Sequence, residues 1–142
     1  RRFLDIVLPF VDLLFIKKED YNLLFEEETN EEKILTKLQK SYGREKIYVL
    51  TQGEEGCSVL YKDEYITQPA YNTDIIDRIG AGDAFVAGFL YGYLTNKGLK
   101  ESAKYGNILA SIKMSVFGDF PALDTCTLKS LLEEENMRGV ER

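Results

Sequence analysis

Hydrophobic positions along the chain follow two different periods, which predicts strands alternating with helices. Residues 11–16 and 46–51 are nearly continuous apolar runs of strand length, as expected for strands buried on both faces. Residues 57–61 and 64–68 form two further short runs on either side of a charged turn. A charged turn between two short runs predicts an antiparallel hairpin at one edge of the sheet.

Helices are predicted from apolar spacing and from end signals. Asn30 is suited to cap a helix, because glutamates follow it in the first turn and lysines stand in the last turn, as the helix dipole favours. The apolar stripe of this helix and the residue that ends it are Ile34, Leu35, Leu38, Tyr42 and Gly43. A later helix, 83–95, carries small residues at four-residue spacing, which predicts close packing against a neighbour. These small residues are Ala84, Gly88 and Gly92, and the other predicted helices cover residues 2–10, 18–25, 99–114 and 127–135.

This order of elements predicts an α/β layered fold with a mainly parallel sheet and a hairpin at one edge. At 142 residues, without a repeat or an interdomain linker, the chain is interpreted as a single domain, 1–142. Ligands in such folds bind at the carboxyl ends of the strands. The turns at 53–56 and 80–83 both fall at such ends, so they are the first candidates for a site.

Composition excludes several classes of function. The net charge of −6 argues against nucleic-acid binding, which needs clustered lysine and arginine. The sequence contains no apolar run of membrane-spanning length and no signal-peptide pattern, so we expect a cytoplasmic protein without a membrane partner. The absence of histidine removes imidazole catalysis and histidine metal sites. Cys57 and Cys126 are expected to be reduced thiols, and association into a homo-oligomer is left open.

The segment from Asp77 to Phe85 contains the strongest candidate residues for binding and catalysis. Its glycine-rich turn, Gly80, Ala81 and Gly82, opens a helix, so backbone N–H groups and the positive end of the helix dipole converge on one spot suited to an anion. Asp83 stands at the rim of this spot, where a carboxylate would repel a phosphate. A carboxylate is useful there if it accepts the proton of a hydroxyl that attacks the phosphate. The turn alone is equally compatible with a purely structural strand-to-helix connection.

Two familiar phosphate-binding loops are excluded. The sequence contains no Gly-x-x-x-x-Gly-Lys-Ser/Thr segment, and Phe85 stands where a dinucleotide-binding loop would need its third glycine. The whole string Asp-Arg-Ile-Gly-Ala-Gly-Asp-Ala-Phe instead resembles the signature of the PfkB, or ribokinase-like, carbohydrate kinases. Arg78, in place of the usual threonine, resembles the 2-keto-3-deoxygluconate kinase branch.

The resemblance implies a fold, cofactors and site residues. It implies the C-terminal half of a three-layer α/β/α ribokinase-like fold, with ATP and Mg²⁺ bound and a sugar or sugar acid as substrate. Asp83 would be the catalytic base and contact the substrate, and the amides of Gly80, Ala81 and Gly82 would form the anion hole. The nucleotide-binding residues would be Thr51, Gly53, Gly56 and Asn107, the second substrate contact Asp119, and the metal-binding residue Asp20.

Each of these positions has a plainer interpretation. Gly53 and Gly56 would serve equally in a hairpin turn, Asn107 on a helix surface and Asp119 in an ordinary loop. Arg78 would equally pair with Asp77 or Asp74. Where the family usually has Asn-x-x-Glu, this chain has Lys17-Lys18-Glu19-Asp20. A lysine at the first of these positions would either repel the metal or neutralise a phosphate directly.

Family members extend considerably further on the N-terminal side, where the sugar pocket and its β-sheet lid lie. We therefore interpret the chain as the nucleotide-binding and catalytic-base part of such a kinase. The leading hypothesis is ATP-dependent phosphorylation of 2-keto-3-deoxygluconate. The alternatives are a non-catalytic nucleotide-binding fragment, or another branch of the family such as a fructokinase or a nucleoside kinase.

Overall fold

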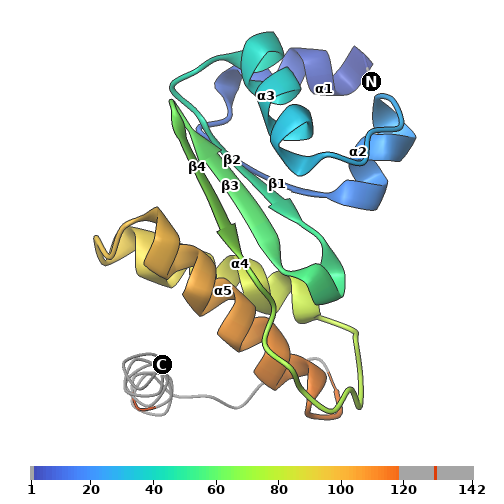
Figure 1. Ribbon diagram of the computed structural model, residues 1–142, viewed down its shortest axis with the longest axis vertical. Coiled ribbons are helices and arrows are strands. Elements are labelled where there is room, and N and C mark those ends of the chain that lie inside the picture. Colours follow the sequence, from blue (N-terminus) through green and yellow to red (C-terminus); the bar gives the residue numbers. More distant parts are fainter. Residues whose placement is uncertain (1, 119–129, 131–142) are drawn as a thin grey trace.

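The computed structural model describes residues 2–118 and residue 130, and Figure 1 shows their arrangement as one sheet between two groups of helices. Asp119, Cys126 and, apart from Ser130, the predicted helix 127–135 lie outside the described residues. The helices are α1 (Arg2–Val7), α2 (Lys18–Leu24), α3 (Glu31–Tyr42), α4 (Ala81–Leu94) and α5 (Leu99–Met114), with short 3-10 helices η1 (Leu8–Phe10) and η2 (Gly53–Glu55). The strands are β1 (Leu13–Lys17), β2 (Ile47–Thr51), β3 (Cys57–Tyr61) and β4 (Glu64–Gln68).

The four described strands form one sheet in the order β1-β2-β3-β4. Strands β1 and β2 are parallel, with Lys17 opposite Thr51, whereas β2–β3 and β3–β4 are antiparallel. The predicted hairpin at the sheet edge is confirmed. The predicted mainly parallel sheet is corrected to a mixed sheet, because only the connection from β1 to β2 contains the helices that a parallel crossover needs.

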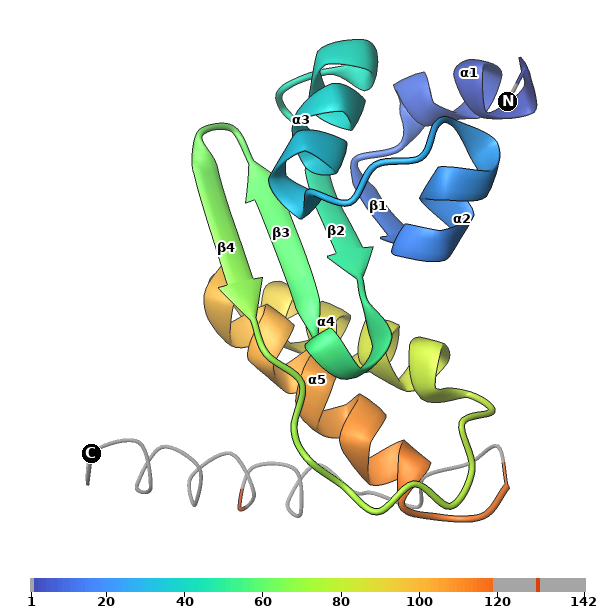
Figure 2. The ribbon, with the colours of Figure 1, turned by 45° about the vertical axis from the view of Figure 1, so that its right-hand side comes forward.

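Each face of the sheet carries its own layer of helices, and Figures 1 and 2 show α2 and α3 on one side with α4 and α5 on the other. Along β2, Tyr48 and Leu50 face the first layer and Val49 the second, which explains the continuous apolar run. The first core also contains Ile34, Leu35, Leu38 and Leu60; the second contains Val59, Phe85, Phe89 and Ala103. The predicted three-layer α/β/α arrangement is confirmed.

Helices α4 and α5 pack against each other along the predicted small-residue groove. A Cβ atom added at Gly88 would lie 2.4 Å from the carbonyl oxygen of Tyr105. One added at Gly92 would lie 2.8 Å from Cα of Ser102. No side chain fits at either position without moving the backbone of α5, so the glycines set the distance between the two helices.

Local signals at the ends of α3 also act as predicted. The side-chain oxygen of Asn30 accepts a hydrogen bond of 2.8 Å from the backbone N–H of Lys33, and Gly43 follows the last residue of the helix with φ 120°. None of the described helices combines the length and the apolar composition that a membrane span requires.

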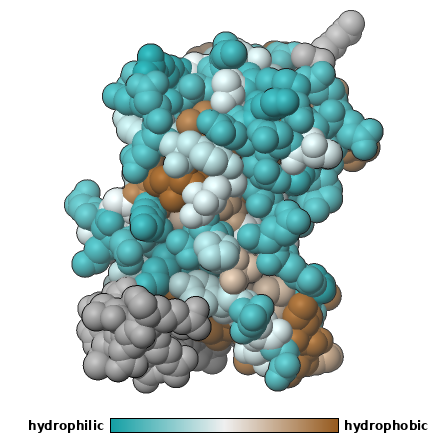
Figure 3. Space-filling view, in the orientation of Figure 1, coloured by the Kyte–Doolittle hydropathy of each residue, from teal (hydrophilic) through white to brown (hydrophobic). Residues whose placement is uncertain are grey.

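Part of the surface is apolar. Figure 3 shows apolar atoms at the lower right of the face drawn in Figure 1, where the segment joining β4 to α4 runs. That segment contains the exposed side chains of Ile75, Ile76 and Ile79, and the N-terminal helices expose Phe3, Ile6, Phe10 and Leu23. Ile79 and Leu23 both line the larger of the two clefts of the candidate site.

Candidate active site

The glycine-rich turn before α4 has the backbone geometry of an anion-binding site. Gly80 has φ 79° and ψ −1°, a left-handed conformation that glycine adopts without strain. The N–H of Ala84 bonds to the carbonyl oxygen of Gly80 at 2.9 Å, and that of Ala81 bonds to Arg78 at 3.3 Å. Helix geometry leaves the N–H groups of Gly82 and Asp83 without an acceptor inside the helix. These two amides are therefore available to an anion. Of the predicted donors Gly80, Ala81 and Gly82, the assignment of Ala81 is corrected, because its N–H is already bonded to Arg78.

Asp77 holds this turn in place. Its carboxylate accepts hydrogen bonds from the backbone N–H groups of Ile79 at 3.0 Å and of Gly118 at 3.3 Å. The first of these bonds is the main reason that the pKa of Asp77 lies below its usual value. From the sequence, Asp77 was expected only as a partner of Arg78, although an aspartate two residues before an exposed amide is a recognisable Asx-turn signal.

Lys113 lies behind the same turn and is completely buried. Its ammonium group is 3.4 Å from the carbonyl oxygen of Asp77 and 3.5 Å from that of Val116. The charge of Lys113 also contributes to the lowered pKa of Asp77. No sequence signal distinguished this lysine from the other lysines of α5, because its burial depends on how α5 meets the turn.

A cleft of about 750 Å³ opens beside the turn on the side of Asp83. Asp83 is exposed and lines this cleft together with Gly80 and Gly82. The ends of β1 and β2 and the start of α2 contribute polar residues, and α1, α2 and the core of β1 contribute an apolar wall. The polar group is Lys17, Asp20, Thr51 and Arg78; the apolar group includes Leu4, Leu8, Leu14, Phe15, Leu23, Leu24 and Val86.

A second cleft of about 250 Å³ lies on the other side of the turn, toward the loop between β2 and β3. Gly53 and Gly56 line it from that loop, Ala81 from α4 and Asn107 from α5. The residues that line both clefts are Lys17, Thr51, Arg78 and Gly82. The two clefts therefore adjoin at the anion-binding turn, so a reactant in each cleft can reach it.

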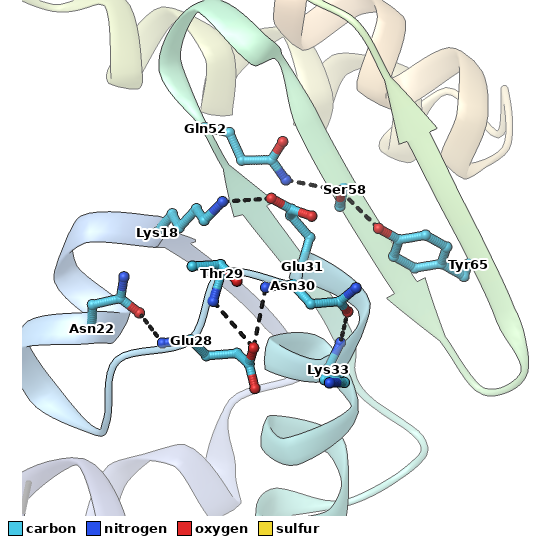
Figure 4. A network of polar contacts seen from close by, with 10 residues as sticks. All are labelled: Lys18, Asn22, Glu28, Thr29, Asn30, Glu31, Lys33, Gln52, Ser58 and Tyr65. Atoms are coloured by element: carbon cyan, nitrogen blue, oxygen red, sulfur yellow. Dashed lines mark hydrogen bonds and ion pairs between the residues drawn. The ribbon is translucent and has the colours of Figure 1, made fainter.

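The loop between β2 and β3 is the hairpin connection that the plainer interpretation predicted, and it also lines the second cleft. Gly56 has φ 102°, and a Cβ atom there would lie 2.1 Å from the carbonyl oxygen of Gln68, so glycine is required. The side chain of Gln52 donates a hydrogen bond of 2.8 Å to Ser58 and thereby fixes the start of the loop (Figure 4). A Cβ atom at Gly53 would contact nothing within 4 Å.

Asn107 is buried beneath this loop, so its interpretation as a helix-surface residue is wrong. Its side-chain N–H₂ donates to the carbonyl oxygens of Gln68 and Pro69, both at 3.0 Å, and thereby ties the end of β4 to α5. It also contacts the sulfur of Cys57 at 3.7 Å. Cys57 is a buried free thiol, as predicted, and burial raises its pKa to about 12. The amide nitrogen of Asn107 is thus committed to the fold.

Arg78 joins the two sides of the second cleft. Its guanidinium donates a hydrogen bond of 2.5 Å to the carboxylate of Glu54, rather than to Asp77 or Asp74 as one sequence interpretation held. The pair therefore connects the turn before α4 to the loop after β2.

Asp20 is exposed and lines the larger cleft, where it is the candidate metal contact. In the described part of the chain, no group of three or more aspartate, glutamate or cysteine side chains is arranged to hold a metal ion. Mg²⁺ in kinase sites usually takes most of its ligands from nucleotide phosphates and water and only one or two from protein carboxylates. A single carboxylate such as Asp20 fits that requirement.

Comparison with known proteins identifies the family. Residues 2–126 match the sequence pattern of the pfkB family carbohydrate kinases, and the chain belongs to this family. It is 30% identical over 136 residues to the 2-dehydro-3-deoxygalactonokinase of Haloferax volcanii, covering 96% of this chain and 42% of that protein. It is 40% identical over 72 residues to an uncharacterized sugar kinase of Archaeoglobus fulgidus, covering 51% of this chain and 29% of that protein.

Comparison with solved structures identifies the fold. A probable sugar kinase from Rhizobium etli superposes with a TM-score of 0.81 at 26% identity, covering 95% of this chain and 39% of that one. An adenosine kinase from Sinorhizobium meliloti gives 0.80 at 26% identity, covering 94% and 39%. A ribokinase from Thermotoga maritima superposes with a TM-score of 0.79 at 19% identity, covering 91% of this chain and 44% of that one, so the fold is ribokinase-like. This chain spans less than half of the length of each of these five proteins.

Proposed function

We propose that this chain is the nucleotide-binding and catalytic-base part of an ATP-dependent kinase that phosphorylates a hydroxyl group of a sugar or sugar acid. The observation that carries this proposal is the meeting of two clefts at one anion-binding turn. Asp83 lines the larger cleft, and the loop containing Gly53 lines the smaller one. This arrangement suits a phosphoryl donor on one side and an acceptor on the other.

In the proposed reaction, ATP occupies the smaller cleft with its terminal phosphate at the start of α4. Asp83 accepts the proton of the acceptor hydroxyl, the hydroxyl oxygen attacks the γ-phosphorus, and the bond from this phosphorus to the bridging oxygen of ADP breaks. The free amides of Gly82 and Asp83 and the dipole of α4 stabilise the negative charge on the transferring group. Asp77 and Lys113 hold the backbone of the turn in position.

The charges that line the clefts suit a nucleotide brought in with a divalent cation. Mg²⁺ bound to the nucleotide neutralises charge on its phosphates, and Asp20 is the carboxylate that would contact it. The other carboxylate lining the larger cleft is Asp83, which the proposed reaction uses as the base.

The proposed substrate is a sugar acid related to 2-keto-3-deoxygluconate. Arg78 within the signature segment supports this choice, as does the similarity along nearly the whole chain to a 2-dehydro-3-deoxygalactonokinase. A fructokinase of Zea mays is 29% identical over 133 residues, and an adenosine kinase shares the fold, so a hexose or nucleoside acceptor is the main competitor. Initial rates of the full-length protein on a panel of sugar acids, ketohexoses and nucleosides distinguish the two.

Coverage of less than half of each relative supports a second candidate, a nucleotide-binding fragment without turnover of its own. Calorimetry with ATP and Mg²⁺ combined with a coupled kinase assay on the chain of 142 residues separates the candidates. Binding with turnover supports a kinase that is complete in this chain. Binding without turnover supports the fragment.

The base assignment is tested by Asp83→Asn in the full-length protein. Loss of a positioned base typically lowers the rate by roughly 10²–10⁴, so turnover is expected to fall by that factor while ATP binding persists. Asp74→Asn is the matched control, because Asp74 is exposed and lines neither cleft. Turnover of Asp83→Asn close to that of the control would exclude Asp83 as the base.

A further inference from the structure

Two consecutive lysines at the end of β1 lie in different environments. The ammonium group of Lys18 donates to the carboxylate of Glu31 at 2.5 Å, which joins the starts of α2 and α3 (Figure 4). This hydrogen bond is the main reason that the pKa of Lys18 is raised. Lys17, in contrast, forms no ion pair or hydrogen bond through its side chain with any residue of the described ranges 2–118 and 130. Lys18 therefore has a structural role, and Lys17 has a free charge.

The position of Lys17 directs that free charge to the junction of the two clefts. Lys17 is the last residue of β1 and lies opposite Thr51 in the sheet, at the carboxyl end of both parallel strands. It lines both clefts. Its Cε atom lies 4.0 Å from the position that a Cβ atom would occupy at Gly82. The ammonium group is thus beside the amides of the anion-binding turn.

Carboxylates outnumber cations around the junction of the two clefts, so the free charge of Lys17 matters for binding an anion there. Four carboxylates line the clefts, namely Asp20, Asp83, Glu19 and Glu54. Among the described residues only two cations, Lys17 and Arg78, line the clefts, and Arg78 is already paired with Glu54. A polyphosphate entering the smaller cleft meets two of these carboxylates there, Glu19 and Glu54, and the other two in the adjoining larger cleft. Lys17 is the cation that remains available to it.

We propose that Lys17 binds the terminal phosphate of the nucleotide directly, from the side of β1, while the amides of Gly82 and Asp83 bind it from the side of α4. The proposal rests on the proposed function, because it assumes a nucleoside triphosphate in the smaller cleft. A lysine ammonium is a compact charge with three donors on a flexible stem, which suits a phosphate group that changes position as it is transferred. Lys17 lies beside Gly82, where the proposed function places the terminal phosphate, so its contact is with that phosphate.

Direct contact with the terminal phosphate predicts discrimination between ATP and ADP. The dissociation constants of both nucleotides are measured by calorimetry at constant free Mg²⁺ on the full-length protein, its Lys17→Met variant and its Lys17→Arg variant. A hydrogen bond to a charged group corresponds to about tenfold or more in affinity, so Lys17→Met is expected to weaken ATP binding by about that factor and to leave ADP binding within about twofold. Lys17→Arg keeps the charge and is expected to retain most of the preference for ATP.

Lys97→Met is the matched control, because Lys97 is exposed and lines neither cleft. Equal weakening of ATP and ADP in Lys17→Met, or no weakening of either, overturns the assignment of Lys17 and leaves the proposed function standing. Failure of the unmodified protein to bind either nucleotide overturns the proposed function, and this inference with it. Thermal unfolding of each variant verifies that it is folded, and Lys17→Gln replaces Lys17→Met if the latter is not.

Discussion

Arg78 and Glu54 form an ion pair of 2.5 Å that spans the smaller cleft, from the turn before α4 to the loop after β2. Their side chains are 61% and 70% exposed, so the pair adds little to the free energy of unfolding. Its importance lies in the charge of the cleft, because it neutralises a carboxylate that faces the proposed phosphate site. The partners are 24 positions apart in the sequence, and no local pattern in the sequence indicates that they meet.

Removal of the carboxylate of Glu54 is expected to strengthen ATP binding. Glu54→Gln deletes a negative charge beside the proposed polyphosphate and frees Arg78 to interact with it, so we predict a dissociation constant for ATP lowered by a few fold. Stability should change by less than about 1 kcal/mol, as is typical of exposed ion pairs. Calorimetry with ATP and chemical denaturation measure the two effects. Glu27→Gln, at an exposed position that lines neither cleft, is the control; weaker ATP binding in Glu54→Gln than in this control would contradict the prediction.

Gly88→Ala tests the packing of α4 against α5. Alanine normally favours a helix over glycine by about 1 kcal/mol, but the new Cβ atom would lie 2.4 Å from the carbonyl oxygen of Tyr105. Forcing a group into a packed interface typically costs about 1–3 kcal/mol, so the variant is expected to be less stable than the parent. Denaturant unfolding measures whether the free energy of unfolding of the variant is lower or higher than that of the parent. An increase in stability would show that α5 shifts without cost.

Ala87→Gly provides the comparison on the exposed side of the same helix. Ala87 is exposed, so its replacement tests helix propensity alone and is expected to cost about 1 kcal/mol. If both substitutions destabilise the protein, helix propensity alone cannot explain the result, because Gly88→Ala adds a methyl group and Ala87→Gly removes one. The loss of stability in Gly88→Ala would then be due to packing against α5.

The pKa of Asp77 leads to a prediction about acid stability. This pKa is lowered in the folded protein, chiefly by the N–H of Ile79, so the unfolded chain binds more protons at low pH. The contribution of Asp77 is therefore present above its unfolded pKa, near 3.9, and is lost as the pH falls through the folded value. Asp77→Asn is expected to be less stable at neutral pH and to lose less stability on acidification. Urea unfolding from pH 3 to 7, with Asp74→Asn as control, tests this; parallel pH profiles of variant and parent would refute it.

The sequence predicted those parts of the fold that depend on neighbouring residues. The cap at Asn30, the hairpin around Lys62 and the turn at Gly80 each depend on side chains or backbone conformations within a few positions, and the structure has all three. The small residues of α4 predicted a close neighbour correctly because four-residue spacing defines one face of a helix. The mixed sheet could also have been predicted from the sequence, since the five-residue connection between β2 and β3 is too short for a parallel crossover.

Parts of the site that depend on long-range packing were not predicted. Lys113 is one of several lysines in the C-terminal half of the chain, and only the meeting of α5 with the turn before α4 buries it. Asn107 lines the smaller cleft, where it was expected as a nucleotide contact, but it is buried and not on a helix surface. Its hydrogen bonds to Gln68 and Pro69 depend on where β4 ends relative to α5. Charge and burial of single side chains follow from the packing of distant elements, which periodicity does not reveal.

Lys113→Met tests whether a buried charge supports the anion-binding turn. Methionine has a similar length and is apolar, so it fills the same space without an ammonium group. Because the charge of Lys113 helps to lower the pKa of Asp77, this pKa is expected to rise in the variant. The loss of positive potential behind the turn should also weaken ATP binding by a few fold. An NMR titration of the Asp77 carboxyl carbon and calorimetry with ATP measure the two effects. Lys100→Met, an exposed position on the same helix, should change neither; an unchanged Asp77 pKa in Lys113→Met would show that the hydrogen bonds from Ile79 and Gly118 alone set it.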